Sequence, residues 1–274
     1  MLWFISLFLL FLIPTQAISA DIDLLLSWDL KPYWEFVEGF QKARLFKTHV
    51  EILGEKADFQ AKGKIFVAVG HRALRAIQQK PALYPFFAAL ILHPSLAGKP
   101  APRGGVYLLL PPEIIFSSLK RALQSLLKKE RVILGIPYST PFNQKLIEEA
   151  AQKAPQWGFE VIPVSLKEGL WLLNKAVSKI DVLYFWPDPF WESREVIVKV
   201  IEQAILQRVI VVGFNNFFLS KGALLAFVID YRKAGYRAAF LVKDCLESSV
   251  CYWEPAPFNL KLNEKLKEFY SKGP

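Results

Sequence analysis

The chain has few of the residues that metal sites and disulfide frameworks require. Its 274 residues include two cysteines, three histidines and one methionine. Two cysteines exclude a four-thiolate zinc site and a small fold held by several disulfides. The histidines, His49, His71 and His93, lie far apart with no second ligand at helical spacing. We therefore expect no metal site.

Motifs of nucleotide-binding and catalytic sites are absent as well. The sequence has no G-x-G-x-x-G after a strand pattern and no G-x-x-x-x-G-K-[ST], G-x-S-x-G or H-E-x-x-H. The segment from Asp181 to Glu192 has the span of a calcium loop, but Leu183 and Phe185 occupy ligand positions. We expect a protein that is not an enzyme and has no cofactor.

Apolar residues, in contrast, are abundant at 53%, above the roughly 45–50% of ordinary globular chains. The length suits two lobes of roughly 100–130 residues each. The net charge of +9 is spread thinly, and its densest runs are Lys128-Lys129 with Arg131, and Arg232-Lys233. A solvated basic surface is favoured over a nucleic-acid-binding face.

The first 20 residues carry no charged side chain and have the order of a secretory signal peptide. Leu2–Ile13 is apolar apart from Ser6 and is too short to span a bilayer. Pro14 ends the run, small residues follow, and charge resumes at Asp21. We expect cleavage after Ala20, with Ala17 as the alternative.

Two features refine this interpretation. No Lys or Arg precedes the apolar run, so a misassigned start or retention of the segment as an anchor stays open. No cysteine follows the run to accept a lipid, and no later stretch reaches 18 uninterrupted apolar residues. The sequence predicts a periplasmic protein that is not an integral membrane protein after cleavage.

The two cysteines, Cys245 and Cys251, are six positions apart, at the end of a predicted helix and the start of a predicted strand. An oxidising compartment favours a disulfide between them over two free thiols. The spacing is not C-x-x-C, so a redox-active pair is not favoured.

Strand and helix patterns alternate along the rest of the chain. Continuous runs of Val, Ile and Leu are typical of parallel strands buried on both faces. Predicted strands are Ile22–Ser27, His49–Leu53, Ile65–Val69, Phe86–Leu92, Val106–Leu110, Val132–Ile136, Phe159–Val164, Val182–Phe185, Val209–Val212, Ala223–Ile229 and Val250–Glu254. Predicted helices are 33–45, 72–79, 112–129, 141–154, 167–177, 193–206, 231–246 and 259–270.

This order predicts two doubly wound, Rossmann-like α/β lobes with parallel sheets. A third strand–helix–strand unit follows two complete lobes, so we expect the chain to return to the first lobe. Lobe I is predicted at 21–109 and 223–255, and lobe II at 110–222 and 256–274. Several crossings between two lobes make a hinge, with a ligand cleft at the carboxyl ends of the strands.

Residues that follow the predicted strands suit a small organic ligand. They mix aromatic rings with short polar groups, and Ser139 and Thr140 can also cap the next helix. Each has a purely structural alternative as a helix cap, a turn residue or part of the core. The selected positions are Trp28, His71, Ser139, Thr140, Asp188 and Asn215, with Trp186 and Phe214 as aromatic lining.

Several of these segments resemble one family. The runs IDVLYFWPDP (Ile180–Pro189), RVIVVGFNN (Arg208–Asn216) and GALLAFVIDYRKAGYRAAFLVKDCL (Gly222–Leu246) resemble ABC-transporter substrate-binding proteins of the type I periplasmic-binding fold. The resemblance is to the branch with tryptophan- and phenylalanine-binding members. SWDLKPYWEFVEGF, VAVGHRAL and GIPYSTPF resemble its ligand-contacting loops.

The resemblance implies ligand contacts at Trp28, His71, Ser139 and Thr140, Asp188 and Asn215. His71 stands where the family has a small hydroxyl residue. The family also implies a permease partner and a monomeric state. In this interpretation Asp188 would pair with an ammonium group, and Ser139 and Thr140 would hold a carboxylate.

Three functions remain open. The favoured one is the periplasmic solute-binding component of an ABC importer, which captures a small organic ligand such as an amino acid or an aromatic compound. The second is a sensory or scaffold module of the same fold that signals to a membrane partner. The third, a two-lobed transferase or hydrolase, lacks a visible phosphate loop or catalytic dyad.

Overall fold

The chain forms two compact units in the computed structural model. The structure describes residues 21–271 except 56–57, 61, 81–84, 125 and 128, so the predicted signal peptide, residues 1–20, lies outside the described residues. Unit 1 consists of residues up to Tyr107 and of Tyr231–Glu254, and unit 2 consists of Leu108–Asp230 and the residues from Pro255 onward. The chain thus passes between the units after Tyr107, Asp230 and Glu254.

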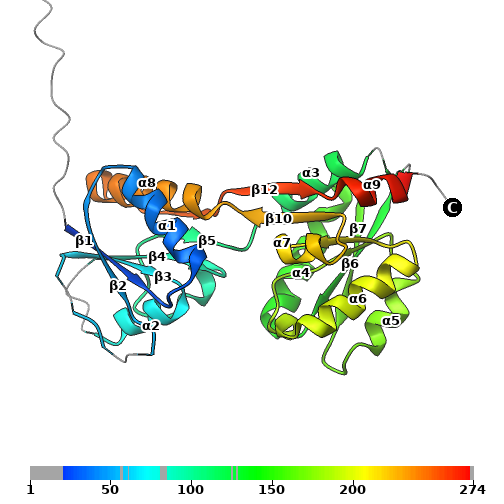
Figure 1. The fold of residues 1–274 in the computed structure, drawn as a ribbon, viewed down its shortest axis with the longest axis horizontal. Coiled ribbons are helices and arrows are strands. Elements are labelled where there is room, and N and C mark those ends of the chain that lie inside the picture. Colours follow the sequence, from blue (N-terminus) through cyan, green and yellow to red (C-terminus); the bar gives the residue numbers. More distant parts are fainter. Residues whose placement is uncertain are drawn as a thin grey trace, which may run out of the picture. The chain divides into compact units, whose positions relative to one another are not determined.

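Unit 1 is built on a sheet that has six strands among the described residues, in the order β11-β5-β4-β3-β1-β2 (Figure 1). β1 pairs in parallel with β2 and β3, and parallel pairing continues to β4 and β5. The strands are β1 Asp21–Leu26, β2 Lys47–Ile52, β3 Ile65–Val69, β4 Phe86–Ile91, β5 Gly105–Tyr107 and β11 Trp253–Pro255.

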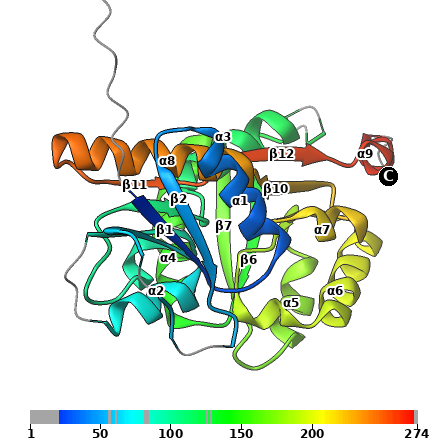
Figure 2. The same cartoon turned by 60° about the vertical axis from the view of Figure 1, so that its left-hand side comes forward.

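Two helices, α1 (Lys31–Lys42) and α8 (Tyr231–Ser248), pack side by side on this sheet (Figures 1 and 2). Glycines at the crossing make the close approach possible. A Cβ at Gly39 would lie 1.9 Å from the Arg232 carbonyl oxygen, and one at Gly235 would lie 1.9 Å from that of Phe36. α2 (His71–Gln78) lies on the opposite face of the sheet (Figure 1).

Unit 2 also has a sheet of six described strands, in the order β12-β10-β9-β8-β6-β7. All described pairs are parallel except β10 with β12, which is antiparallel. The strands are β6 Val132–Tyr138, β7 Phe159–Ser165, β8 Val182–Tyr184, β9 Ile210–Gly213, β10 Leu225–Ile229 and β12 Phe258–Leu262. The helices are α3 Pro112–Leu123, α4 Pro141–Lys153, α5 Trp171–Val177, α6 Arg194–Leu206, α7 Asn216–Ser220 and α9 Glu264–Ser271, with 3-10 turns η2 Ala154–Trp157 and η3 Pro189–Glu192. The 3-10 turn η1, Pro94–Leu96, belongs to unit 1.

These two mostly parallel α/β sheets confirm the predicted fold class. Two details differ from the prediction. The strand expected at Ala223–Ile229 belongs to unit 2 and not to lobe I, because β10 pairs with β9 and β12. The chain returns to unit 1 only at Tyr231, the first residue of α8.

The predicted terminal helix from Asn259 to Tyr270 is wrong in its first half. Phe258–Leu262 is strand β12, and α9 begins only at Glu264. The burial of FNLKL alternates, as expected of a strand, and its partner β10 offers an otherwise open edge. No helix of the described residues is long and apolar enough to cross a membrane.

Candidate functional site

In unit 2, the loops after β6 and β8 are joined by the Asp188 carboxylate. Oδ2 of Asp188 accepts hydrogen bonds from the Ser139 backbone N–H at 2.9 Å and from Asn143 Nδ2 at 2.7 Å. Oδ1 accepts from the Ser139 hydroxyl and from the Phe190 N–H. A carboxylate has about four acceptor positions. The unit's own groups therefore fill those of Asp188.

These hydrogen bonds favour the charged form of Asp188, although only 9% of the residue is exposed to solvent. Burial opposes ionisation, but the hydrogen bonds from Ser139, Asn143 and Phe190 outweigh it and hold the pKa of Asp188 below its usual value. Asp188 is therefore an anion at neutral pH.

The first turn of α4 is ordered by the same loop. Thr140 caps the helix, since its Oγ1 accepts from the Asn143 N–H at 3.1 Å. Asn143, which is 1% exposed, also donates from Nδ2 to the Pro187 carbonyl at 3.0 Å. Its Oδ1 is buried without a hydrogen-bond partner among the described residues. An unpartnered buried acceptor of this kind costs free energy until a donor reaches it.

The remaining predicted residues of unit 2 divide between surface and core. Asn215 caps α7 by accepting from the Phe217 N–H at 3.0 Å. Phe214 is half-buried and packs on Phe218, with ring centroids 4.7 Å apart. Trp186 is only 2% exposed and packs edge-to-face on Tyr184, so it lies in the interior beneath the strand ends. Of the two predicted lining rings, Phe214 is the more accessible.

In unit 1, Ser27 joins the ends of β1 and β3 to α2. Its hydroxyl donates to the Val69 carbonyl at 2.8 Å and accepts from the Ala73 N–H at 2.9 Å. Gly70, between β3 and α2, has φ 88°. A Cβ there would lie 2.5 Å from the Tyr33 hydroxyl and 2.6 Å from Ser27 Oγ, so the turn requires glycine.

This turn places His71 and Trp28 at the same sheet edge. Burial, and then the positive charge of Arg75, lower the pKa of His71. Its Nδ1 is buried with no hydrogen-bond partner in the described part of the chain. Trp28 is 39% exposed, and the Arg72 guanidinium lies 4.8 Å from its ring centroid. This edge of unit 1 thus presents the neutral imidazole of His71 and the partly exposed indole of Trp28, with the Arg72 guanidinium close to the indole ring.

Each unit therefore collects its predicted residues at one sheet edge. Carboxyl ends of parallel strands share an edge, and the residues after β1 and β3 in unit 1, and after β6, β8 and β9 in unit 2, obey this rule. Sequence reasoning missed Ser27 and Asn143 as functional positions. A small polar residue directly after a strand, and a polar residue in the first turn of the next helix, were the available signals. The described residues include no group of three or more His, Cys, Asp or Glu side chains that could hold a metal ion.

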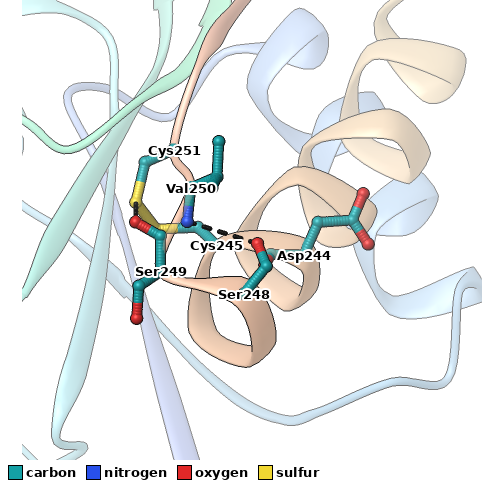
Figure 3. Close-up of a disulfide and its surroundings, with 6 residues drawn as sticks. All are labelled: Asp244, Cys245, Ser248, Ser249, Val250 and Cys251. Atoms are coloured by element: carbon teal, nitrogen blue, oxygen red, sulfur yellow. Dashed lines mark hydrogen bonds between the residues drawn. A yellow bond between two sulfur atoms is a disulfide. The ribbon is translucent and has the colours of Figure 1, made fainter.

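The two cysteines lie away from these edges, where α8 leads into β11. The structure joins Cys245 and Cys251 by a disulfide (Figure 3). Ser249 turns the chain with φ 61°, and its N–H donates to the Cys245 carbonyl at 3.0 Å. The next N–H, of Val250, donates to the Ser248 hydroxyl at 3.2 Å (Figure 3).

Comparison with known proteins identifies the fold. No protein-family model matches the chain, and no curated protein matches it. The solved structures described below match over nearly the full length of this chain and of their own. Their sequence identities are under 25%, so the likeness shows a shared fold and nothing more. The chain has the type I periplasmic-binding fold of ABC-transporter substrate-binding proteins, which confirms the resemblance noted in the sequence.

Three of these structures illustrate the likeness in fold. The ligand-free, open structure of CD0873, a substrate-binding protein with adhesive properties from Clostridium difficile, has a TM-score of 0.69 at 19% identity, over 92% of this chain and 95% of that one. An ABC domain in complex with L-Trp from Streptococcus pneumonia has a TM-score of 0.59 at 15% identity, over 90% and 94%. A periplasmic ribose ABC transporter protein from Conexibacter woesei has a TM-score of 0.58 at 12% identity, over 92% and 95%.

Proposed function

We propose that the protein is the periplasmic solute-binding component of an ABC importer and that it is exported by residues 1–20. The observation that carries the proposal is the match of both units, over 90–92% of the chain, to solute-binding proteins. The absence of a membrane-crossing helix among the described residues is compatible with it. A permease would be the partner, and the working form would be a monomer.

The proposed ligand is a small organic molecule, and the sheet edge of each unit by itself offers groups that an aromatic amino acid could use. Trp28 offers an exposed ring for stacking. The Thr140 hydroxyl, which accepts from the Asn143 N–H, can donate its own proton to a carboxylate. His71 and Asn143 each keep a buried polar atom without a partner in the described residues. Among ligand classes, these groups suit an aromatic amino acid best.

In this proposal Asp188 acts as a positioning residue. Its oxygens are already occupied by Ser139, Asn143 and Phe190. A ligand ammonium would have to displace one of these donors, whereas the ordered loop can contact a ligand without any loss. Asp188 therefore influences affinity through the Ser139–Thr140 loop.

The test is calorimetric titration of the protein after unfolding and refolding to remove ligand carried through purification. Probes are L-tryptophan, L-phenylalanine, D-ribose and D-allose; heat is measured because the fluorescence of L-tryptophan would mask that of Trp28. We expect micromolar binding of an aromatic amino acid, weakened roughly tenfold by Trp28→Ala, since aromatic stacking contributes about 0.5–1.5 kcal/mol beyond its area. Glu192→Gln, exposed on η3, is the control.

Two outcomes redirect the proposal. Saturable binding of a sugar alone would keep the solute-binding function and reject the amino-acid class. Absence of binding by all four probes, with the refolded protein showing a cooperative melt, would favour the sensory or scaffold alternative.

A further inference from the structure

Unit 1 contains a cavity of about 480 Å³ that lies apart from the strand ends described above. Its floor comes from Asp23–Leu25 of β1 and His49–Glu51 of β2, within the strands, whereas Trp28 and His71 follow the carboxyl ends of their strands. It is formed by Asp23, Leu24, Leu25, His49, Val50, Glu51, Asp58, Phe59, Gln60, Lys62 and Phe66. Because all of these residues belong to unit 1, the cavity is complete within that unit.

The connection between β2 and β3 explains the cavity. Parallel strands are usually joined by a helix that covers one face of the sheet. Here residues 53–64 make the connection, and no helix occurs in its described part. On this face α2 contacts β3 and β4. Of the described residues, those that cover the neighbouring face of β1 and β2 include Asp58, Phe59, Gln60 and Lys62 of this connection.

Asp23 is buried in the floor of this cavity. The parallel register sets Asp23 opposite His49 and Leu25 opposite Glu51, so these side chains share one face. Asp23 is 6% exposed, and its Oδ2 accepts from the N–H groups of Lys62 and Gly63 at 2.8 Å each. Its Oδ1 has no hydrogen-bond partner in the described residues. A buried carboxylate oxygen in this position calls for a donor or a cation.

The other charges around the cavity favour a cation. Glu51 adds a second carboxylate, which accepts from the Gln60 N–H at 3.2 Å. Asp58 is already paired with Lys80 at 2.7 Å. Lys62 supplies one positive charge to the lining. Asp23 and Glu51 thus leave the lining negative in a chain whose net charge is +9.

The walls are apolar and aromatic. Phe59 and Phe66 pack edge-to-face with ring centroids 5.9 Å apart, and both belong to a buried cluster with Leu25. Carboxylates at the floor and rings at the wall are complementary to an ammonium group on a short apolar body. A free metal ion fits less well, because the described residues hold no group of three or more ligating side chains.

We propose that this cavity is a second binding site, for a small organic amine whose ammonium group pairs with Asp23 and whose apolar body lies against Phe59 and Phe66. The site is independent of the ligand proposed for the strand ends. Occupation of it would give Oδ1 of Asp23 a partner.

The test is calorimetric titration of the refolded protein at pH 7 with benzylamine, and with benzyl alcohol as its uncharged counterpart. We expect saturable binding of benzylamine and at least tenfold weaker binding of benzyl alcohol, since a charged hydrogen-bonded pair is lost. Asp23→Asn should weaken benzylamine binding at least tenfold. Glu51→Gln should weaken it about threefold, because that carboxylate acts across a longer distance.

Controls keep the outcome decisive. Glu55→Gln, an exposed carboxylate in the same loop, and Asp188→Asn in unit 2 should leave benzylamine binding unchanged. No saturable binding of benzylamine, equal binding of benzyl alcohol, or loss of binding in Asp188→Asn overturns the proposal. If Asp23→Asn does not fold, Glu51→Gln decides, and unchanged affinity in that variant overturns it. Failure here leaves the aromatic amino-acid test unaffected, since that test uses other probes and other variants.

Discussion

Ser139 is bound to Asp188 twice: its backbone N–H donates to Oδ2 at 2.9 Å and its hydroxyl donates to Oδ1. The two residues are 49 positions apart, so one carboxylate fixes the loop after β6 against the loop after β8. Asn143 donates to the same carboxylate from the first turn of α4. The edge of unit 2 is ordered before any ligand arrives.

Replacement of Asp188 by Ala should therefore destabilise unit 2. It leaves the donors of Ser139, Asn143 and Phe190 without their acceptor, and we expect a loss of about 3 kcal/mol in the free energy of unfolding. Urea denaturation at pH 7 measures it. Glu192→Ala should change the free energy by less than about 0.5 kcal/mol. An equally small effect of Asp188→Ala would show that the network contributes little.

The contribution of Asp188 should also depend on pH. Its pKa in the folded protein lies below the ordinary value of 3.8. The stabilisation is therefore present at neutral pH and is lost as the pH falls through the folded pKa. The difference between the wild-type protein and Asp188→Ala should shrink between pH 5 and pH 3. A constant difference over that range would contradict the charged network.

Gly70→Ala should be more costly than Gly169→Ala. Both glycines have a left-handed φ, 88° and 87°, so the conformational strain of the new side chain is matched. A Cβ at Gly70 meets Tyr33 and Ser27, whereas one at Gly169 has nothing within 4 Å. We expect about 1 kcal/mol for Gly169→Ala and a further 1–3 kcal/mol, roughly, for Gly70→Ala. Thermal unfolding of the two variants side by side measures the difference.

The two cysteines should not react with reagents that modify free thiols, and their disulfide should stabilise unit 1. A loop this short predicts a contribution of about 2 kcal/mol from restriction of the unfolded chain. Denatured protein without reductant should contain no reactive thiol, and reductant should lower the urea midpoint. Cys251→Ala should show the same lower midpoint with and without reductant. Two reactive thiols in unreduced protein would reject the bridge.

His71 should titrate below its ordinary value of 6.5. The unfolded chain then takes up the proton first, so stability falls as the pH drops from about 6.5 towards the folded pKa. Proton NMR of the imidazole follows this directly. Arg75→Gln should raise the pKa of His71 but leave it below the ordinary value, because it removes a nearby positive charge while burial remains. His71→Gln should remove this part of the pH dependence of unfolding.

Local patterns were sufficient to locate most elements. The predicted strand Ile65–Val69 coincides with β3, and the predicted helix Arg72–Gln79 overlaps α2, His71–Gln78. These segments have strong local apolar patterns that do not depend on pairing with a distant part of the chain. β12 was missed because its strand character depends on pairing with β10, whose paired residues lie 29 to 37 positions earlier. Because this long-range pairing is not visible in the sequence, Ala223–Ile229 was predicted in the wrong lobe.

Site residues were predictable by position and less so by role. The rule of strand ends selected Ser139, Thr140 and Asp188, and the structure brings them together. It also selected Trp186, which the structure buries. The direction in which a side chain leaves a loop depends on packing from other elements, and sequence order carries little of that information. The cavity beside Asp23 was missed for a related reason. It lies where the described part of the connection between β2 and β3 forms no helix over the sheet.

The close packing of α1 against α8 has a consequence for the order of folding during synthesis. α8 and β11 belong to unit 1, but they are translated after nearly all of unit 2. Until residues 231–255 emerge from the ribosome, α1 lacks the helix against which Gly39 packs, and β5 lacks its outer neighbour. The nascent first unit therefore keeps an incomplete sheet edge and an uncovered apolar helix face through most of translation. We therefore expect unit 1 to reach its final packing only after residues 231–255 have been made.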